Sequence, residues 1–192
     1  MKSYDILLKT MILGTSNVGK TQMIEYFRNN ELRENYFPTA GVDFAITILK
    51  SHNKVVKCQI WDTGGNKQFI GTIQHYEIGV NIFFVLFDKT ARRTFDEVNY
   101  CYNNAISEKG KNMLMYLIGN KSDLEDKREV TVKEAQIKAN IFNMRYVEMT
   151  NKDRNRIDEI FKLAIDDYLS INENKVIINL KDKRKIIRNY CF

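Results

Sequence analysis

Short apolar runs alternate along the chain with segments in which apolar residues recur every three or four positions. The first kind is typical of β-strands and the second of amphipathic helices. The strand candidates are residues 6–13, 42–49, 55–61, 82–87, 113–119 and 145–148. The helix candidates are residues 21–29, 95–108, 131–143 and 156–171. This alternation predicts an α/β fold, in which a doubly wound, mostly parallel six-stranded sheet carries helices on both faces.

The connections between these segments refine the prediction. A polar turn at 51–53 joins the second and third strands, so we expect them to form a hairpin with the second strand at the sheet edge. Segments 30–40 and 64–79 lack a clear period. We expect a loop in the first of them and a short helix near the end of the second. Thr131, followed by Glu134, predicts a capping box that opens its helix.

Residues 14–21, G-T-S-N-V-G-K-T, fit the phosphate-binding pattern G-x-x-x-x-G-K-[ST]. The pattern lies between a predicted strand and a predicted helix, where unpaired backbone N–H groups and the helix dipole favour an anion. Lys20 would reach the β- and γ-phosphates, and the Thr21 hydroxyl would ligate Mg²⁺. The alternative, a chance match in a glycine-containing loop, is disfavoured by this context. The residues expected to hold the phosphates are Ser16, Asn17, Val18, Gly19, Lys20, Thr21 and Gln22.

A second motif, Asn120-Lys121-Ser122-Asp123, follows the strand candidate 113–119 and indicates which base is bound. The Asp123 carboxylate can accept hydrogen bonds from guanine N1–H and from the 2-amino group, whereas adenine has no donors in that arrangement. An unpaired buried carboxylate would therefore reject adenine. Asn120 can bond the purine edge and brace the phosphate loop, and the Lys121 stem can lie along the ring. By itself the motif also fits an ordinary surface turn, but its place at a strand end favours guanine binding.

The third motif is D-x-x-G at Asp62 to Gly65, at the end of strand 55–61. The carboxylate can hold a Mg²⁺-bound water, and the Gly65 N–H can meet the γ-phosphate. With Pro38 and Thr39 upstream, the chain resembles a small GTPase of the Ras superfamily over about residues 5 to 170. It is most similar to the Rab branch. The similar segments are A-G-V-D-F at 40–44 beside the Rab I-G-V-D-F, K-C-Q-I-W-D-T at 57–63 beside K-L-Q-I-W-D-T, and V-E-M-T-N-K at 147–152 in the place of the E-T-S-A-K base loop.

The resemblance implies a P-loop small G domain that binds GTP or GDP with Mg²⁺ and regulates vesicle traffic as a slow GTPase switch. The implied metal ligands are Thr21, Thr39 and Asp62, and the implied catalytic residues are Asn66, Lys20 and Gly65. The further nucleotide contacts are Leu32, Thr39, Gly65, Asn120, Lys121, Asp123, Thr150, Asn151 and Lys152.

Partners are implied in the same way. An exchange factor, a GTPase-activating protein and effectors would act on switch I (33–41), switch II (62–76) and an aromatic triad. The triad is Phe44, Trp61 and Tyr76, each of which could instead be an ordinary core residue. A nuclear-transport or cytoskeletal GTPase of the same superfamily is a further alternative, but the Rab-like segments around Phe44 and Trp61 argue against it.

The chain departs from the Rab pattern at four places. Asn66 stands where a glutamine usually orients the attacking water, and Ala40 where an isoleucine is usual. Leu32 lies near the usual place of an aromatic that packs on guanine, and Asn17 replaces a frequent glycine. Asparagine tolerates the left-handed conformation, so we expect the loop to survive. Asn66 predicts slow hydrolysis, and a durably GTP-loaded binding module with little or no turnover stays open as an alternative.

Charge is concentrated at the C-terminus. Residues 175–192 hold six Lys and Arg residues and one Asp, which leaves 24 cations and 23 acids in the rest of the 192-residue chain. We therefore expect a G domain at 1–174 and a basic flexible tail at 175–192, and no nucleic-acid partner. The tail suits an anionic cytosolic membrane leaflet, although a merely solvated end is the alternative.

The cysteines and the hydropathy bear on location. Cys191 is the only candidate for prenylation as a second membrane signal, although the ending N-Y-C-F fits neither C-a-a-X nor the usual Rab double cysteine. The three cysteines are widely spaced, which argues for a reducing compartment and against a zinc site or a disulfide framework. No apolar run approaches the ~20 residues of a membrane span. The Rab resemblance and the basic tail together imply a cytoplasmic protein that is peripheral on the cytosolic face of an intracellular membrane.

Overall fold

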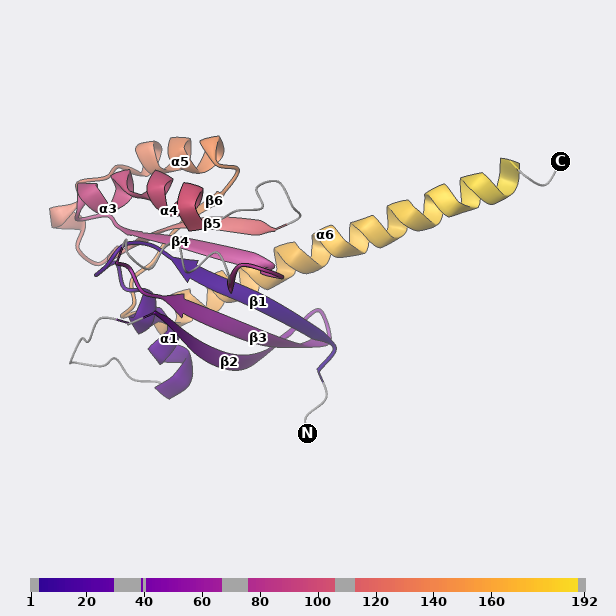
Figure 1. Ribbon diagram of the computed structural model, residues 1–192, viewed down its shortest axis with the longest axis horizontal. Helices are drawn as coiled ribbons and strands as arrows, with labels where there is room; N and C mark the ends of the chain where they lie inside the picture. Colours follow the sequence, from indigo (N-terminus) through magenta and orange to yellow (C-terminus); the bar gives the residue numbers. More distant parts are fainter. Residues whose placement is uncertain (1–3, 30–38, 40, 67–75, 106–112, 190–192) are drawn as a thin grey trace.

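One sheet organises the fold in the part of the chain that the computed structural model describes, residues 4–29, 39, 41–66, 76–105 and 113–189. Its six strands lie in the order β2-β3-β1-β4-β5-β6 (Figure 1). β2 pairs antiparallel with β3, and the other neighbouring pairs are parallel. The strands are β1 (Ile6–Leu13), β2 (Val42–Ser51), β3 (Lys54–Thr63), β4 (Ile82–Asp88), β5 (Leu114–Asn120) and β6 (Arg145–Glu148). The predicted doubly wound α/β fold is confirmed, with β2 at the edge.

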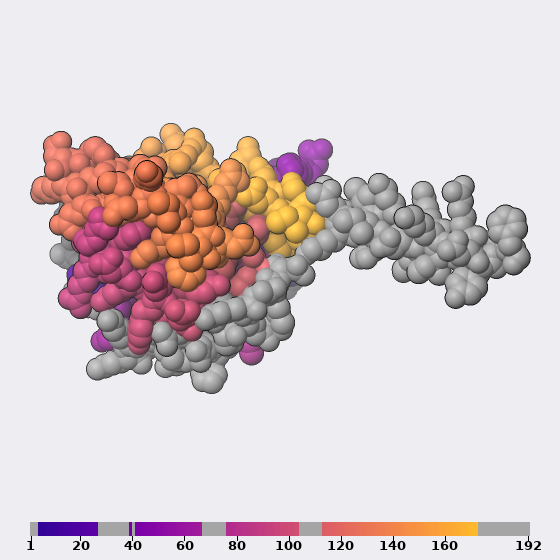
Figure 2. Space-filling model, turned by 90° about the horizontal axis from the view of Figure 1, so that it is seen from above, coloured from indigo at the N-terminus to yellow at the C-terminus, as the bar shows by residue number. Residues whose placement is uncertain are grey.

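Helices cover both faces of this sheet (Figure 1). α3 (Arg92–Asp96), α4 (Val98–Ala105) and α5 (Val132–Ile141) lie on one face, and α1 (Lys20–Asn29) and the first part of α6 (Arg154–Asn189) lie on the other. The rest of α6 extends away from the sheet. Figure 2 looks onto the first face, where α5 lies beside the α3–α4 pair. A short 3₁₀ turn, η2 (Glu125–Lys127), follows β5.

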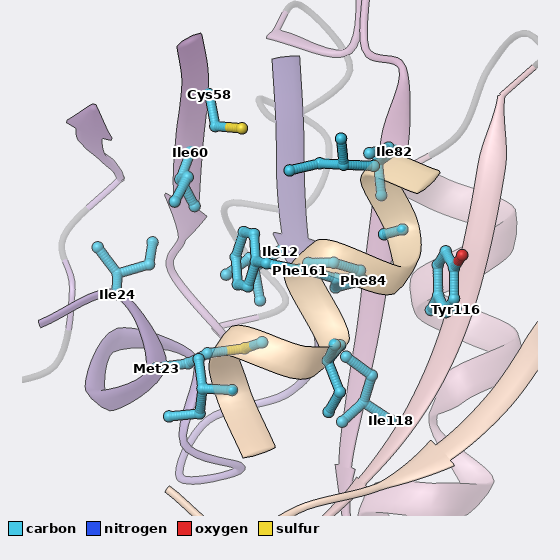
Figure 3. Close-up of a cluster of buried hydrophobic side chains, with 14 of the residues drawn as sticks. Ile12, Met23, Ile24, Cys58, Ile60, Ile82, Phe84, Tyr116, Ile118 and Phe161 are labelled. Carbon is cyan, nitrogen blue, oxygen red and sulfur yellow. The ribbon is translucent and has the colours of Figure 1, made fainter. Parts of the chain in front are cut away.

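The two faces of the central strand β1 supply two separate cores. Leu8 and Ile12 point into the cluster shared with α1 and α6, while Met11 and Leu13 point into the cluster shared with α3, α4 and α5. In the first cluster Phe161 of α6 packs edge-on against Phe84 of β4, with ring centroids 4.9 Å apart (Figure 3). The alternation of side chains along a strand thus fixes both helical layers to the sheet.

The helix expected at 95–108 is corrected by the structure. It begins at Arg92, and its described part is divided into α3 and α4 at Glu97. The early start has a tertiary cause, because the carboxylate of Glu129, distant in sequence, accepts the Arg92 N–H at 2.6 Å. Ala91, at the N-cap, supplies no side-chain cap of its own.

The later helices also differ from their predicted bounds. The capping box of Thr131 and Glu134 is confirmed, but α5 ends at Ile141 because Asn143 adopts a left-handed φ of 53°. α6 was expected to end near Ile171, yet its backbone continues to Asn189. Residues 172–189 contain no proline or glycine, so nothing in the sequence interrupts the helix. The short helix expected near the end of 64–79 falls mostly outside the described residues. No helix in the described ranges combines the length and apolar character that a membrane span needs.

Candidate nucleotide-binding site

The phosphate-loop motif occupies the turn between β1 and α1, as its sequence predicts. Gly19 has a φ of 96°, and Asn17 adopts the expected left-handed conformation with a φ of 67°. The Lys20 side chain is buried and donates to the Thr15 carbonyl at 2.7 Å. Burial lowers the pKa of Lys20 to about 8, against the nearby charge of Asp62, which raises it. A cation held against a turn that leads into a helix N-terminus suits a phosphate chain.

Three oxygen-bearing side chains meet beside this lysine. Thr21 Oγ1 donates to Asp62 Oδ2 at 2.6 Å, and Thr39 Oγ1 donates to the same oxygen at 3.2 Å. The two threonine hydroxyls lie 2.9 Å apart. Burial raises the pKa of Asp62, whereas the hydrogen bond from Thr21 and the charge of Lys20 oppose that shift. The structure therefore brings together the three predicted Mg²⁺ ligands, and a hard cation prefers such oxygens.

The base-loop motifs converge on Asp123. Its carboxylate accepts from Thr150 Oγ1 at 2.7 Å and from Lys152 Nζ at 2.6 Å. The hydrogen bond from Lys152, followed by that from Thr150, lowers the pKa of Asp123 and keeps the carboxylate charged. An ionised acceptor at this place matches two neighbouring donors on a base edge.

Two asparagines link the base loops to the phosphate loop. Asn120 Nδ2 donates to the Val18 carbonyl at 2.7 Å, which is the brace that the sequence predicts. Asn151 Nδ2 donates to the Gly19 carbonyl at 2.9 Å. These two hydrogen bonds therefore connect the loops that are expected to bind the base with the loop that is expected to bind the phosphates.

Gly65 and Asn66 lie beside the phosphate loop. A Cβ atom placed on Gly65 would lie 2.3 Å from the Ser16 nitrogen and 2.7 Å from Lys20 Nζ, so only glycine fits there. Asn66 lines a hollow of about 540 Å³ together with Ser16, Asn17 and Gly65. The predicted catalytic residues are thus neighbours of the loop that would hold the phosphates.

Several buried polar atoms at this site fit a nucleotide and a cation. Within the described ranges, Asp62 Oδ1, Asn120 Oδ1, Asn151 Oδ1 and Thr15 Oγ1 are buried without a hydrogen-bond partner. Buried polar atoms in proteins are normally paired, and orphans of this kind mark places where a ligand supplies the partner. Their positions, beside the metal ligands and between the base and phosphate loops, agree with the motif assignments.

Two site residues were missed by the sequence reasoning. Asp88 pairs with Lys121 at 2.5 Å, and Lys89 is fully buried, with its amine bound to the carboxylate of Glu125 and to the Ser122 carbonyl. Burial works against the charged form of Asp88, but hydrogen bonds from Lys121 and Thr90 outweigh it and lower its pKa. Their position in the sequence could have revealed them, because both residues directly follow the apolar strand 82–87. Ligand-binding loops of such sheets lie at that end of the strands.

The remaining predicted contacts are only partly described. Leu32, most of switch I and residues 67–75 of switch II lie outside the described residues. Within the triad, Phe44 lies 4.9 Å from Trp61, and Trp61 lies 5.6 Å from Tyr76, measured between ring centroids. Phe44 and Trp61 are half-buried and Tyr76 is exposed, so the three rings form one cluster that reaches the surface.

Comparison with known proteins identifies relatives along nearly the whole chain. A family model described as "Ras family" matches residues 9–170. The chain is 33% identical over 160 residues to GTP-binding protein ypt2 of Schizosaccharomyces pombe, covering 83% of this chain and 80% of that protein. It is 34% identical over 172 residues to Ras-related protein Rab-19 of Rattus norvegicus, covering 89% and 79% respectively. It is 33% identical over 197 residues to Ras-related protein Rab-1 of Theileria annulata, covering 98% and 89%.

Proposed function

The chain belongs to the Ras family and is a Rab-type small GTPase, and from that premise we propose how its own residues bind the nucleotide, hydrolyse it and reach a membrane. Proteins of this type bind GTP and GDP with Mg²⁺, hydrolyse GTP, and regulate vesicle traffic through exchange factors, activating proteins and effectors. Because the family consists of GTPases, the alternative of a binding module without turnover is not supported.

One observation carries the assignment of the site. The oxygens of Thr21, Thr39 and Asp62 meet within hydrogen-bond distance beside the buried amine of Lys20. These three residues would hold Mg²⁺, which when bound supplies positive charge beside the phosphates. Lys20 would neutralise the β- and γ-phosphates, and the Gly65 N–H would contact the γ-phosphate. Thr39 would sense that phosphate from switch I, so that loss of the γ-phosphate would release both switch segments.

Guanine selection is assigned to Asp123. An Asp123→Asn variant keeps the shape but turns one acceptor oxygen into a donor NH₂ group. We expect weaker GTP binding and improved binding of xanthosine triphosphate, whose 2-oxo group requires a donor. Competition against a fluorescent GDP analogue measures both. If ATP competes as well as GTP for the unmodified protein, Asp123 does not select the base.

Hydrolysis is assigned to the Asn66 region and is slow. In this chemistry a glutamine amide holds the attacking water in line, and Asn66 carries the same amide on a side chain one methylene shorter. A misplacement of ~1 Å can cost ~10²-fold in rate. An Asn66→Gln variant should therefore hydrolyse bound GTP faster in a single turnover with little change in GTP affinity. An unchanged rate would mean that another group holds the water.

The C-terminal residues 175–192 serve as the membrane address, with the G domain at 1–174. Their six cations and one acid suit an anionic cytosolic leaflet, at about 1 kcal/mol for each basic residue close to the surface. Charge alone anchors weakly, so prenylation of Cys191 supplies the second signal. The protein would then be peripheral on the cytosolic face of an intracellular membrane. Intact-mass spectrometry of the membrane-bound protein from its native cell tests this, and an unmodified Cys191 in that fraction would refute the lipidation.

A further inference from the structure

Asn151 departs from the base-loop pattern that the chain otherwise resembles. In the E-T-S-A-K loop the residue before the final lysine is alanine, whereas this chain has Asn151 before Lys152. An alanine side chain cannot donate or accept a hydrogen bond. The asparagine therefore adds a polar group at a place where the related loop has none.

The added amide is buried and points at the phosphate loop. Asn151 is 6% exposed, and its Nδ2 donates to the Gly19 carbonyl at 2.9 Å and to Gln22 Oε1 at 3.3 Å. Gly19 precedes Lys20, and its carbonyl also accepts from the Met23 N–H at 3.1 Å in the first turn of α1. Asn151 is therefore bonded to the point at which the phosphate loop becomes a helix.

This contact duplicates one made by Asn120. Asn120 binds the carbonyl of Val18 and Asn151 binds the carbonyl of Gly19, so two consecutive carbonyls are held by two different base loops. Both amide nitrogens occupy the space that a side chain at Gly19 would need, because a Cβ there would lie 2.3 Å from Asn120 Nδ2 and 2.4 Å from Asn151 Nδ2. We refer to these two hydrogen bonds as the double clasp.

The Oδ1 atoms of both asparagines give a second indication that these amides face a bound ligand. Each is buried and without a hydrogen-bond partner among the described residues. Buried amides of this kind are normally satisfied on both sides. The two amides thus each hold the phosphate loop with one end and leave the other end for a ligand group.

We propose that Asn151 is a positioning residue that slows nucleotide release by clasping the base loop to the phosphate loop. This inference rests on the proposed nucleotide site and deepens its regulation. For a nucleotide to leave, the base loops and the phosphate loop must separate, and the double clasp opposes that separation with one buried and one partly buried hydrogen bond. An exchange factor must then break the Asn151 contact as well as the Asn120 contact.

The test is the dissociation rate of a fluorescent GDP analogue from the full chain, chased with excess GDP. Asn151→Ala should release the analogue between about twofold and about tenfold faster, the range of one net buried hydrogen bond. Asn151→Asp keeps the shape but places a carboxylate oxygen against the Gly19 carbonyl, so its release should be faster still. The matched control is Asn140→Ala, an exposed asparagine on α5, whose release rate should equal that of the unmodified protein.

The outcomes of this experiment distinguish a failure of the role proposed for Asn151 from a failure of the proposed function. If Asn151→Asp releases the analogue at the unmodified rate, Asn151 only fills space and the clasp is refuted. If Asn151→Ala cannot be purified, Asn151→Asp alone decides, because it preserves the packing. If the unmodified protein binds no guanine nucleotide, the proposed function itself fails. Tight binding with identical release from all variants rejects only the role of Asn151.

Discussion

Replacing Gly19 with alanine should weaken nucleotide binding by far more than a typical glycine substitution. The φ of 96° costs an alanine about 1–3 kcal/mol in strain. The new Cβ would lie 2.3 Å and 2.4 Å from the two clasping amide nitrogens, so both asparagines must move. Displacing Asn120 leaves the Val18 carbonyl unsatisfied at a cost of about 1–3 kcal/mol. Displacing Asn151 costs only the net value of one hydrogen bond, about 0.5–1.5 kcal/mol, because the Gly19 carbonyl keeps the Met23 N–H. The sum is at least about 2.5 kcal/mol, which is more than about fiftyfold in affinity if it acts on the bound state.

The assay is equilibrium titration with a fluorescent GDP analogue in Mg²⁺. Gly79→Ala is the matched control, because Gly79 also has a positive φ, 75°, but a Cβ there meets nothing within 4 Å. That variant should lose some stability to strain and keep its GDP affinity. If Gly19→Ala binds the analogue within tenfold of the unmodified protein, the two asparagines do not hold the loop as described.

Three further predictions concern the scaffold. Phe161→Ala removes a fully buried ring that packs edge-on against Phe84. It should lower the free energy of unfolding, measured by urea denaturation, by about 3–5 kcal/mol, and a loss below about 1 kcal/mol would contradict the packing. Thr131→Ala breaks the capping box of α5 and should cost about 0.5–2 kcal/mol in the same assay, and no change would mean that the cap is energetically neutral. Burial raises the pKa of Cys58 to about 12, so at pH 8 only about one Cys58 thiol in 10⁴ is ionised. In a variant in which Cys101 and Cys191 are replaced by serine, iodoacetamide should therefore not label Cys58. Labelling of Cys58 should rise as the pH approaches 12, and rapid labelling at pH 8 in the folded protein would refute its burial.

The strands were predictable because each one is a short apolar run bounded by polar turns. Strand β1 lies at 6–13, as its pattern indicates, and the ends of β4 and β5 differ from the prediction by one residue. The motifs follow the carboxyl ends of these strands, and ligands of parallel α/β sheets bind at that end. The sequence alone therefore predicts that Thr21, Asp62 and Asp123 belong to one site.

The features that the sequence alone could not predict depend mostly on tertiary contacts. The start of α3 depends on a carboxylate from Glu129, and no local signal near Arg92 reports it. The buried Lys89 is held by Glu125, which is distant along the chain. The direction of the Asn151 amide, toward Gly19 and away from solvent, depends on how two loops pack. The length of α6 has a local explanation instead, because residues 172–189 contain no proline or glycine that would end the helix where its apolar stripe stops.

The central claim is that the convergent site holds a guanine nucleotide with Mg²⁺. The most direct measurement is to denature freshly purified protein and identify the released nucleotide by chromatography and mass spectrometry. The protein should release GDP or GTP in a near-equimolar amount, and this nucleotide should be retained in Mg²⁺ and lost when the cation is chelated. Adenine nucleotides in its place, or equal affinity for ATP and GTP when the protein is reloaded, would contradict it.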